Sequence, residues 1–278
     1  MSVTEPLVGA TAETAPLTAR VSRLSDTGLR REHNEDRCLV QMLGRPAEEG
    51  VFDAPVVLAG AALLLAVCDG MGGAAAGEVA SAISVETLSR RAALRSTADG
   101  GDPGEIERWL VEGVREANRM TLERVVADPA LEGMGSTLTA AVLSGASMVL
   151  AHVGDSRAYH LRDGSLRRVT ADHSLVGRLV ALGRITEEQA REHEQRHLLL
   201  EAIGTDSEPE IDRGTVPLLP GDRVLLCSDG LTDLVRDEEI GRVMEGRSAP
   251  AEQCAALVAM ANGRGGVDNV TVVIAHLS

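Results

Sequence analysis

The chain has 278 residues and a formal net charge of −15, and its core must be built almost without aromatic side chains, because it holds one Trp, one Tyr and one Phe. A surface this acidic repels nucleic-acid phosphates and anionic membranes, which excludes both as expected partners. The four cysteines include no Cys-x-x-Cys pair, which disfavours a zinc ribbon or a redox motif.

The N-terminal segment has no basic start followed by an apolar run, so it is not expected to be a signal peptide. The most apolar stretch, 54–68, falls short of the ~20 residues that a membrane helix needs. We therefore expect a cytoplasmic protein. Residues 1–17 are rich in Ala, Thr, Glu and Pro and predict a flexible tail, followed by one domain over 18–278.

The first part of the domain is expected to form strands. Apolar runs predict strands near Ala19–Leu24 and Arg37–Leu43, with a loop near Gly44–Gly50. The stretch 54–68 predicts one or two buried strands.

Two helices are predicted next. The first covers about Gly77–Arg91, and the second begins after Asp102, which can cap it, with Pro103 at its first position. Apolar residues at helical spacing continue this second helix.

The middle of the chain returns to strands. Short apolar segments predict strands over Ser136–Leu143, Met148–Val153 and Arg157–Leu161. The segment 174–200 is polar and helical, and Thr186 opens a capping box within it.

The C-terminal part begins with a buried strand, Arg223–Cys227. Helices near Asp237–Glu245 and Ala251–Ala261 follow, and a strand over Asn269–Ala275 closes the chain. Because strands and helices come in groups rather than in alternation, the order favours two packed sheets with helices outside over a parallel α/β fold.

Acidic residues recur where these apolar strands end. They are Asp69 beside Gly70, Asp155 after Gly154, Asp229 beside Gly230, and Asp268 just before the last strand, with Glu35 and Asp36 nearer the N-terminus. An Asp-Gly after a strand is ordinarily a turn. Four instances at buried strands point instead to carboxylates held rigidly at a site, where oxygen ligands select Mg²⁺ or Mn²⁺. Their number suits two ions bridged by one carboxylate, which would activate a water.

At these residues the sequence resembles the metal-dependent protein phosphatases, the PPM or type 2C serine/threonine family, in its bacterial form. The blocks that carry the resemblance come in family order: SDTGLRREHNEDR, VCDGMGGAAAGEVAS, GMGSTLTAAVL, VGDSRAYHLRDG, TADHSLV, LLCSDGLTD and DNVTVVIA. They extend over nearly the whole chain. The resemblance implies a four-layer αββα sandwich of two antiparallel sheets flanked by helix pairs.

The resemblance also implies roles for the acids. Asp69 matches the carboxylate that bridges two tightly bound Mn²⁺ or Mg²⁺ ions, and Gly70 matches the residue that offers its backbone carbonyl. The other implied metal residues are the direct ligands Asp229 and Asp268, the water-holding acids Glu35 and Asp36, and Asp155 with Asp233 at a third, weaker ion.

Arg31 matches the arginine that grips the substrate phosphate, a task that suits its planar guanidinium. Arg30 does not match the motif and is expected to be a surface residue. Met71 stands where some relatives carry a histidine proposed as the general acid, and because Met has no proton to give, that role is open. For His33, His173, His193 and His197 we expect structural or solvent roles.

Residues 174–200 match a variable flap beside the active site, expected to be mobile and to shape substrate choice. Glu201 stands where relatives usually carry Arg, which would reverse the charge preference of the adjoining surface.

The resemblance implies dephosphorylation of phosphoserine and phosphothreonine in proteins. The expected partners are Ser/Thr kinases and their substrates, and we expect a monomer. A different phosphomonoester substrate, a non-catalytic phosphoprotein binder and a metal-dependent nuclease are the alternatives. The last is disfavoured by the acidic charge, and the second by the presence of every central acid.

Overall fold

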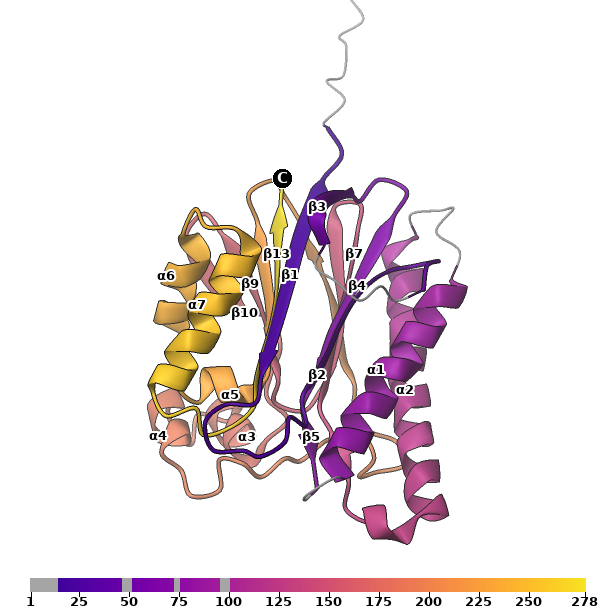
Figure 1. The fold of residues 1–278 in the computed structure, drawn as a ribbon, viewed down its shortest axis with the longest axis vertical. Coiled ribbons are helices and arrows are strands. Elements are labelled where there is room, and N and C mark those ends of the chain that lie inside the picture. Colours follow the sequence, from indigo (N-terminus) through magenta and orange to yellow (C-terminus); the bar gives the residue numbers. More distant parts are fainter. Residues whose placement is uncertain (1–14, 47–51, 73–75, 96–100) are drawn as a thin grey trace, which may run out of the picture.

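The computed structural model describes residues 15–46, 52–72, 76–95 and 101–278. Two antiparallel sheets lie face to face between two helix pairs (Figure 1). Helices α1 and α2 cover one outer face, and α6 and α7 cover the other. The fold is therefore the αββα sandwich that the resemblance implied.

Each main sheet is antiparallel throughout the described residues. The six-stranded sheet has the order β10 (Ser165–Arg168), β9 (Arg157–Arg162), β12 (Arg223–Cys227), β13 (Val270–Leu277), β1 (Thr18–Asp26), β3 (Phe52–Val57). The five-stranded sheet has the order β11 (Asp212–Pro217), β8 (Ser147–Val153), β7 (Leu138–Ser144), β4 (Ala62–Cys68), β2 (Arg37–Met42). A short ladder joins β5 (Gly70–Met71) to β6 (Gly135–Ser136).

Two of the helices begin at capping residues that the sequence indicated. Their bounds are α1 (Ala76–Leu94), α2 (Pro103–Ala127), α3 (Leu175–Ala181), α4 (Glu187–Arg191), α5 (Asp229–Thr232), α6 (Asp237–Glu245) and α7 (Pro250–Gly263), with a 3₁₀ turn over Pro129–Leu131. The side chain of Asp102 accepts a hydrogen bond from the Glu105 amide and caps α2. Thr186 forms the predicted capping box with Gln189 at α4. Both caps are confirmed.

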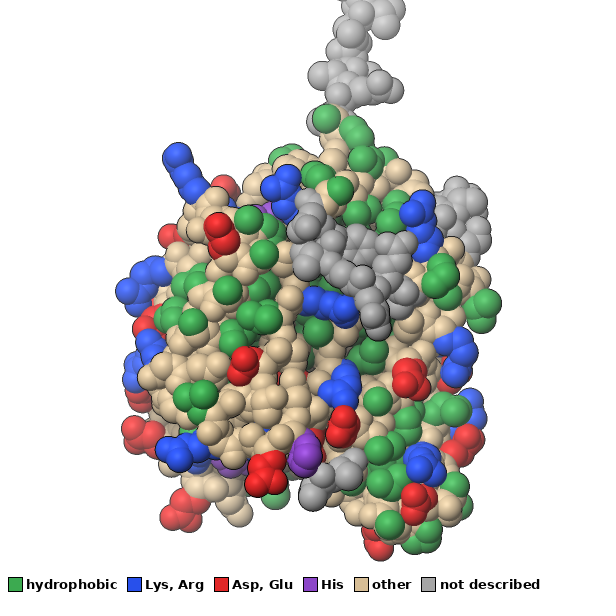
Figure 2. Space-filling view, in the orientation of Figure 1, with side chains coloured by type: hydrophobic (Ala, Val, Ile, Leu, Met, Phe, Trp, Pro, Cys, Tyr) green, Lys and Arg blue, Asp and Glu red, His purple; other side chains and the backbone are tan. Residues whose placement is uncertain are grey.

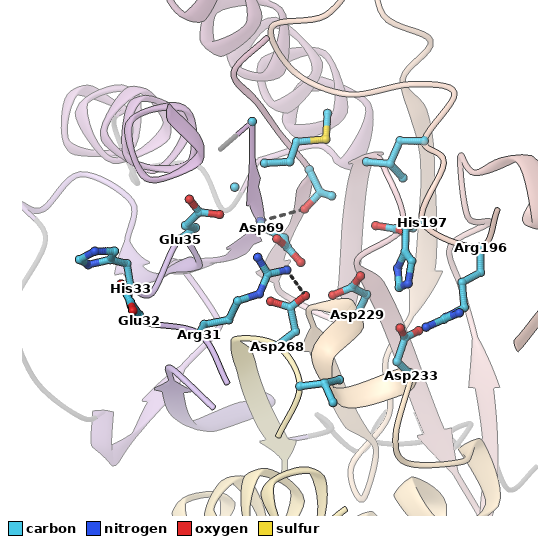
Figure 3. A pocket seen from close by; sticks show the side chains of 17 residues that line it. Arg31, Glu32, His33, Glu35, Asp69, Arg196, His197, Asp229, Asp233 and Asp268 are labelled. Carbon is cyan, nitrogen blue, oxygen red and sulfur yellow. Dashed lines mark hydrogen bonds and ion pairs between the residues drawn. The ribbon is translucent and has the colours of Figure 1, made fainter. Parts of the chain in front are cut away.

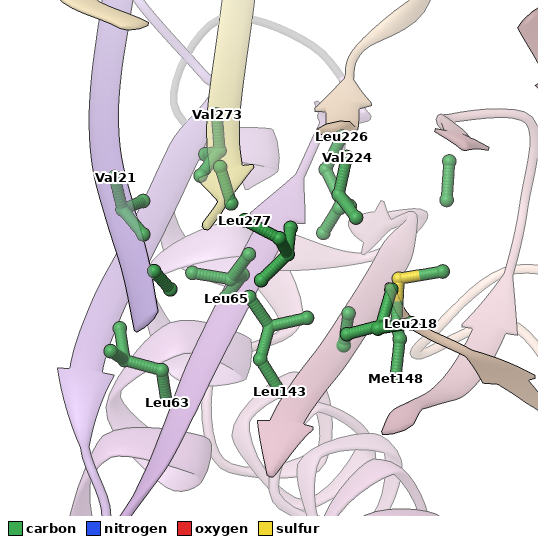
Figure 4. Close-up of a cluster of buried hydrophobic side chains, with 14 of the residues drawn as sticks. Val21, Leu63, Leu65, Leu143, Met148, Leu218, Val224, Leu226, Val273 and Leu277 are labelled. Atoms are coloured by element: carbon green, nitrogen blue, oxygen red, sulfur yellow. The ribbon is translucent and has the colours of Figure 1, made fainter. Parts of the chain in front are cut away.

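Side chains of a central strand alternate between the two faces of its sheet. Because both faces are covered, the sequence of such a strand is apolar at every position. Every residue of β4 is buried. Leu63 and Leu65 point into the cluster between the two sheets, which Figure 4 shows, whereas Leu64 and Ala66 pack under α1 and α2. A strand covered on both faces buries both sets of side chains, so no polar alternation is left for the sequence to display.

The termini of the domain meet in the six-stranded sheet. The Thr18 amide donates to the carbonyl of Ser278 over 2.7 Å, and β1 pairs with β13 along its length. Within the segment expected to be a tail, 1–14 lie outside the described residues, and Leu17 is buried against the core between the sheets. Of the expected loop near Gly44–Gly50, residues 47–50 also lie outside the described part.

Several elements differ from the sequence prediction. The apolar stretch 54–68 holds two strands, but β3 is an exposed edge strand rather than a buried one, so burial was wrong there. Pro55, which has no N–H to donate, is tolerated in β3 because an edge strand leaves such positions unpaired. Strands β10 and β11 and helix α5 were not predicted, since the two strands are polar edge strands and α5 has only four residues.

Charged side chains of both signs lie on the surface. Figure 2 shows arginine and acidic side chains interspersed on one face, with apolar side chains between them. Among the described residues, no helix combines the length and the apolar run needed to cross a bilayer. All four cysteines are free thiols, and Cys68, Cys227 and Cys254 are buried.

Candidate metal centre

Sheet topology brings the strand-end acids to one edge of the sandwich. Strands β4 and β8 both pair antiparallel with β7, so they run in the same direction and end at the same edge. Asp69 follows the first and Asp155 the second. In the other sheet, the end of β12 pairs with the beginning of β13, at Cys227 and Val272, which places Asp229 beside Asp268. Four acids far apart in sequence are therefore neighbours.

An open cavity of about 630 Å³ lies at this edge (Figure 3). Of the predicted site residues, all but Asp36 line it; they are Arg31, Glu35, Asp69, Gly70, Asp155, Asp229, Asp233 and Asp268. Glu32, His33, Met71, Gly72, Thr137, Arg196, His197, Leu199 and Val267 complete the lining. The predicted acids do come together.

Asp36 does not line the cavity and is buried instead. It is only 2% exposed, and its Oδ2 accepts a 2.7 Å hydrogen bond from the Ser228 hydroxyl. The same hydroxyl accepts from the Thr271 amide over 3.0 Å. Ser228 and Thr271 thus tie Asp36 to the ends of β12 and β13.

Two backbone contacts fix Asp69. Its amide donates to Thr137 Oγ1 over 2.9 Å, and its carbonyl accepts from the Thr137 amide over 2.8 Å. Thr137 Oγ1 also lies 2.7 Å from Ser156 Oγ, next to Asp155. Thr137 therefore joins the segments that carry two of the acids.

Gly70 is required by the close approach of α1. A Cβ on Gly70 would collide with the carbonyl of Gly77, and a Cβ on Gly77 would collide with the backbone of Gly70. Glycine at both positions lets the first turn of α1 lie directly against β5, which follows Asp69.

The loop that carries Arg31 and Glu35 is held by Asn269. The Asn269 Oδ1 accepts from the Glu35 amide over 2.8 Å, and its Nδ2 donates to the carbonyls of Thr27 and His33, each over 2.9 Å. Ser81, on α1, donates its hydroxyl to the carbonyl of Glu35 from the other side. The loop is thereby clamped between β13 and α1.

Arg31 reaches into the cavity from this loop. Its Nη2 lies 2.7 Å from Asp268 Oδ2, while half of its side chain, 51%, stays exposed. The guanidinium has five N–H donors in a planar fork, so the contact with Asp268 leaves others free for an anion. Arg30 is exposed, as predicted.

The carboxylates are held at an electrostatic cost. Burial, together with neighbouring acids, raises the pKa values of Asp69 and Asp229 well above the ordinary range. Burial likewise raises the pKa of Asp36 to about 6, and burial with Asp172 and Asp233 raises that of Asp155 to about 7. Carboxylates packed this closely are stabilised either by protons or by cations between them.

Two buried oxygens favour the second possibility. Asp36 Oδ1 and Asp229 Oδ1 are buried and have no hydrogen-bond partner among the described residues. Buried polar atoms are almost always paired, so orphaned carboxylate oxygens at a crowded acidic site suit metal coordination. The acids of the centre offer only oxygen donors, the set that Mg²⁺ and Mn²⁺ prefer.

The histidines divide into two groups. His33 and His197 line the cavity, whereas His173 and His193 do not. The His193 ring accepts from the Gln195 amide and so has a local structural role. Met71 lines the cavity at the position where a proton donor was in question.

The segment 174–200 forms one wall of the cavity. It contains α3 and α4 and contributes Arg196, His197 and Leu199 to the lining. Arg191 donates to the carbonyl of Thr232 over 2.6 Å, which attaches α4 to α5. Glu201 turns away into the following loop, where its Oε2 accepts from the Glu210 amide.

Sequence reasoning missed Thr137, Ser228 and Asn269. Ser228 and Asn269 lie next to the predicted ligands Asp229 and Asp268, so adjacency was the available signal for them, whereas Thr137 has no predicted ligand near it in the sequence. Arg196 gave none, because it lies in a polar segment and reaches the site only through the fold.

Comparison with known proteins agrees with this geometry. A family model described as Protein phosphatase 2C matches residues 53–263. The serine/threonine phosphatase stp of Listeria welshimeri is 37% identical over 254 residues, which cover 90% of this chain and 92% of that protein. The serine/threonine protein phosphatase PstP of Mycobacterium tuberculosis is 42% identical over 264 residues, which cover 94% of this chain and 45% of that protein.

Solved structures give the same result. The serine/threonine phosphatase of S. agalactiae superposes with a TM-score of 0.80 at 32% identity, over 93% of this chain and 99% of that one. The catalytic domain of PstP, in complex with two manganese ions, superposes with a TM-score of 0.77 at 39% identity, over 94% of this chain and 99% of that one. The chain therefore belongs to the protein phosphatase 2C family, in the form that these bacterial serine/threonine phosphatases share.

Proposed function

We propose that this protein removes phosphate from phosphoserine and phosphothreonine in other proteins, with two Mn²⁺ or Mg²⁺ ions at the acidic cavity. The observation that carries this proposal is the convergence of Asp69, Asp229 and Asp268 on one cavity, with a buried carboxylate oxygen that has no partner among the described residues. The two manganese ions in the similar PstP domain support the same stoichiometry.

Each acid has a role in this proposal. Asp69 would bridge the two ions, Gly70 would offer its carbonyl, and Asp229 and Asp268 would be direct ligands. Glu35 and Asp36 would act through water. Asp155 and Asp233 would hold a third, weaker ion.

When bound, the ions supply charge neutralisation and lower the pKa of the attacking water. The side chains of the protein position the substrate phosphate. Phosphoryl transfer depends on alignment and charge more than on covalent participation by the protein. Arg31 would bind two phosphate oxygens through its fork, and the clamp by Asn269 holds the loop that presents it.

The proposed partners are phosphorylated proteins, including Ser/Thr kinases and their substrates, met in the cytoplasm by a monomeric enzyme. The acidic charge of −15 disfavours a nuclease. A non-catalytic binder is disfavoured because no central carboxylate is missing. The open form of the cavity supports a substrate phosphate that is carried on a protein side chain.

The test is phosphate release from matched peptides that carry phosphothreonine, phosphoserine or phosphotyrosine, with Mn²⁺ present. We expect turnover of the first two to exceed that of the third and of small phosphomonoesters in kcat/KM. Equal kcat/KM for all four would favour a general phosphomonoesterase, and binding without turnover would favour a regulator.

A further inference from the structure

Two exposed apolar side chains lie at the cavity, close to Arg31 in the fold. Leu29 is 66% exposed and lies on the loop between β1 and β2, two residues before Arg31. Val267 is 49% exposed, lines the cavity and directly precedes Asp268. Single exposed apolar residues are common on soluble proteins, but these two lie on adjoining loops that both lead into the cavity. We call Leu29 and Val267 the apolar rim.

Hydrogen bonds hold the two loops of the rim together. The Leu29 amide donates to the Gly266 carbonyl over 2.7 Å. Asp26 Oδ1 accepts from the Gly28 amide over 2.8 Å and from Asn262 Nδ2 over 3.0 Å, which ties the turn before Leu29 to the end of α7. The backbone of the rim is therefore fixed, although its side chains are exposed.

Two glycines let these loops approach closely. Gly28 and Gly266 have positive φ angles of +78° and +49°. A Cβ on Gly28 would collide with the Asp268 carbonyl, and a Cβ on Gly266 would lie 2.9 Å from Leu29 Cγ. Without these Cβ atoms, the Leu29 side chain lies against the bare backbone of Gly266 and is left open to a partner.

The cavity is asymmetric along its length. Figure 3 shows Arg31 beside Asp268, and Arg196 and His197 at the other end of the view. Val267, next to Asp268 in the chain, belongs to the first end. A polypeptide bound across the cavity would therefore meet apolar surface on one side of its phosphorylated residue and cationic side chains on the other.

We propose that Leu29 and Val267 select substrates with an apolar side chain on one side of the phosphorylated residue. This inference rests on the proposed phosphatase function and names a feature of its substrates. The occupant is a segment of substrate polypeptide, because the rim is continuous with the cavity that would take its phosphate.

The physical basis is burial against an ordered surface. An extended chain advances about 3.3 Å per residue, so side chains within about three positions of the phosphorylated residue can reach the rim. Burial of an apolar side chain there removes apolar area from water. Because the loops are already fixed by hydrogen bonds, little further ordering opposes this gain.

The test uses phosphothreonine peptides in which one position at a time, from three before to three after the phosphothreonine, is Leu or Ser. Wild type should prefer Leu to Ser by about tenfold in kcat/KM on one side only, near the lower end of what full burial of a leucine supplies. Leu29→Ser and Val267→Ser should each reduce this ratio, and the double variant should bring it close to one.

Val57→Ser is the matched control. Val57 is 47% exposed and pairs with Thr18, at the opposite end of β1 from Leu29. This variant should keep the wild-type ratio, as should Val267→Ile, which keeps an apolar side chain at the rim. Each ratio compares two peptides on one enzyme, so a general loss of activity cancels. A ratio near one at every position in wild type, or a wild-type ratio in the double variant, would overturn the proposal.

Binding gives a second readout that needs no turnover. The same Leu and Ser peptides, with a non-hydrolysable phosphonate in place of the phosphothreonine, should show the same preference in Kd, and the double variant should lose it. Equal Kd values for Leu and Ser at every position in wild type would contradict the rim. If no peptide releases phosphate while the Kd preference holds, the proposed phosphatase function fails and the rim does not.

Discussion

The buried carboxylates of Asp69 and Asp229 lower the stability of the metal-free chain. Burial and neighbouring carboxylates raise their pKa values well above the ordinary range. Neither acid has a salt bridge among the described residues. Residues that destabilise a fold in this way are typical of functional sites.

Replacing either acid by Asn should therefore separate activity from stability. Asp69→Asn and Asp229→Asn should lose about 10²-fold or more in kcat, because each removes a charge from the site of the proposed ions. Without metal at pH 8, both variants should melt at a higher temperature than wild type, since one charge of a repelling cluster is gone. Near-normal turnover in either variant would show that the ligand assignment is wrong.

Arg31 is predicted to act on the phosphate. A charged hydrogen bond is worth about 1.5–3 kcal/mol, so Arg31→Ala should lower kcat/KM for a phosphopeptide by about tenfold to a hundredfold, mainly through KM. Arg30→Ala removes the same charge from the neighbouring exposed position and is the control. If kcat/KM falls equally in Arg31→Ala and Arg30→Ala, the loss reflects the net charge of the surface and not a contact between Arg31 and the phosphate.

Asp155 should behave differently from the central acids. Its proposed ion is the weaker one, so Asp155→Ala should lower kcat while the two tight ions still bind. Metal stoichiometry and kcat, measured on the same preparation, check this division. Loss of the two tight ions in Asp155→Ala would place Asp155 in the central pair instead.

At the scale of elements, the loop between β1 and β2 depends on one amide side chain. Asn269 is 4% exposed and makes three hydrogen bonds to the loop. Asn269→Ala leaves these backbone groups unpaired and should destabilise the protein by about 1–3 kcal/mol. Because the loop carries Arg31 and Glu35, kcat/KM should fall as well.

Asn118 supplies a matched control for this element. It is 2% exposed and makes three hydrogen bonds that join α2 to the loop 204–207, away from the cavity lining. Asn118→Ala should destabilise to a similar degree in urea unfolding while kcat/KM stays near wild type. If both variants lose kcat/KM equally, the loss reflects stability rather than the position of the loop.

Elements were predictable where their own residues specify them. The run that ends at Asp69 is apolar because β4 is covered on both faces, and the caps Asp102 and Thr186 mark helix starts locally. Strand β11 was missed because only Val216 in it is buried. Its position is determined by pairing with β8, which local sequence does not encode.

Prediction of the site was limited in the same way, because contacts between distant segments are not encoded in the local sequence. The acids were predictable because each follows or precedes a buried strand. The depth of Asp36 was not, since it depends on Ser228, which lies 192 residues away in sequence. His197 was expected to have a structural or solvent role, and only the fold places it beside Asp229 and Asp233.

At the scale of the whole molecule, the acid cluster should make metal-free stability depend on pH. Asp36 and Asp155, with pKa values raised by burial to about 6 and about 7, bind protons more tightly when folded than the unfolded value of about 3.9 allows. Their contribution to stability is thus full below about pH 4 and is lost as the pH rises through 6 and 7.

Urea unfolding in EDTA should accordingly give a lower free energy of unfolding at pH 8 than at pH 5. Burial raises the pKa of Asp172, but the ion pair with Arg157 outweighs burial and lowers it. Asp172 therefore changes the free energy of unfolding only below about pH 4, outside the range from pH 5 to pH 8. Mn²⁺ at pH 8 should restore the lost stability by binding the folded state. A free energy that rises from pH 5 to pH 8 in EDTA would contradict the burial of uncompensated acids.

The most direct test of a metal-dependent phosphatase is to titrate Mn²⁺ into the metal-free protein while phosphate release from a phosphothreonine peptide and bound metal are measured together. We predict no turnover in EDTA, and turnover that appears as two ions bind per chain, with Zn²⁺ a poor substitute because the central donors are all oxygen. Full turnover in EDTA, with metal analysis confirming an empty site, would contradict the account.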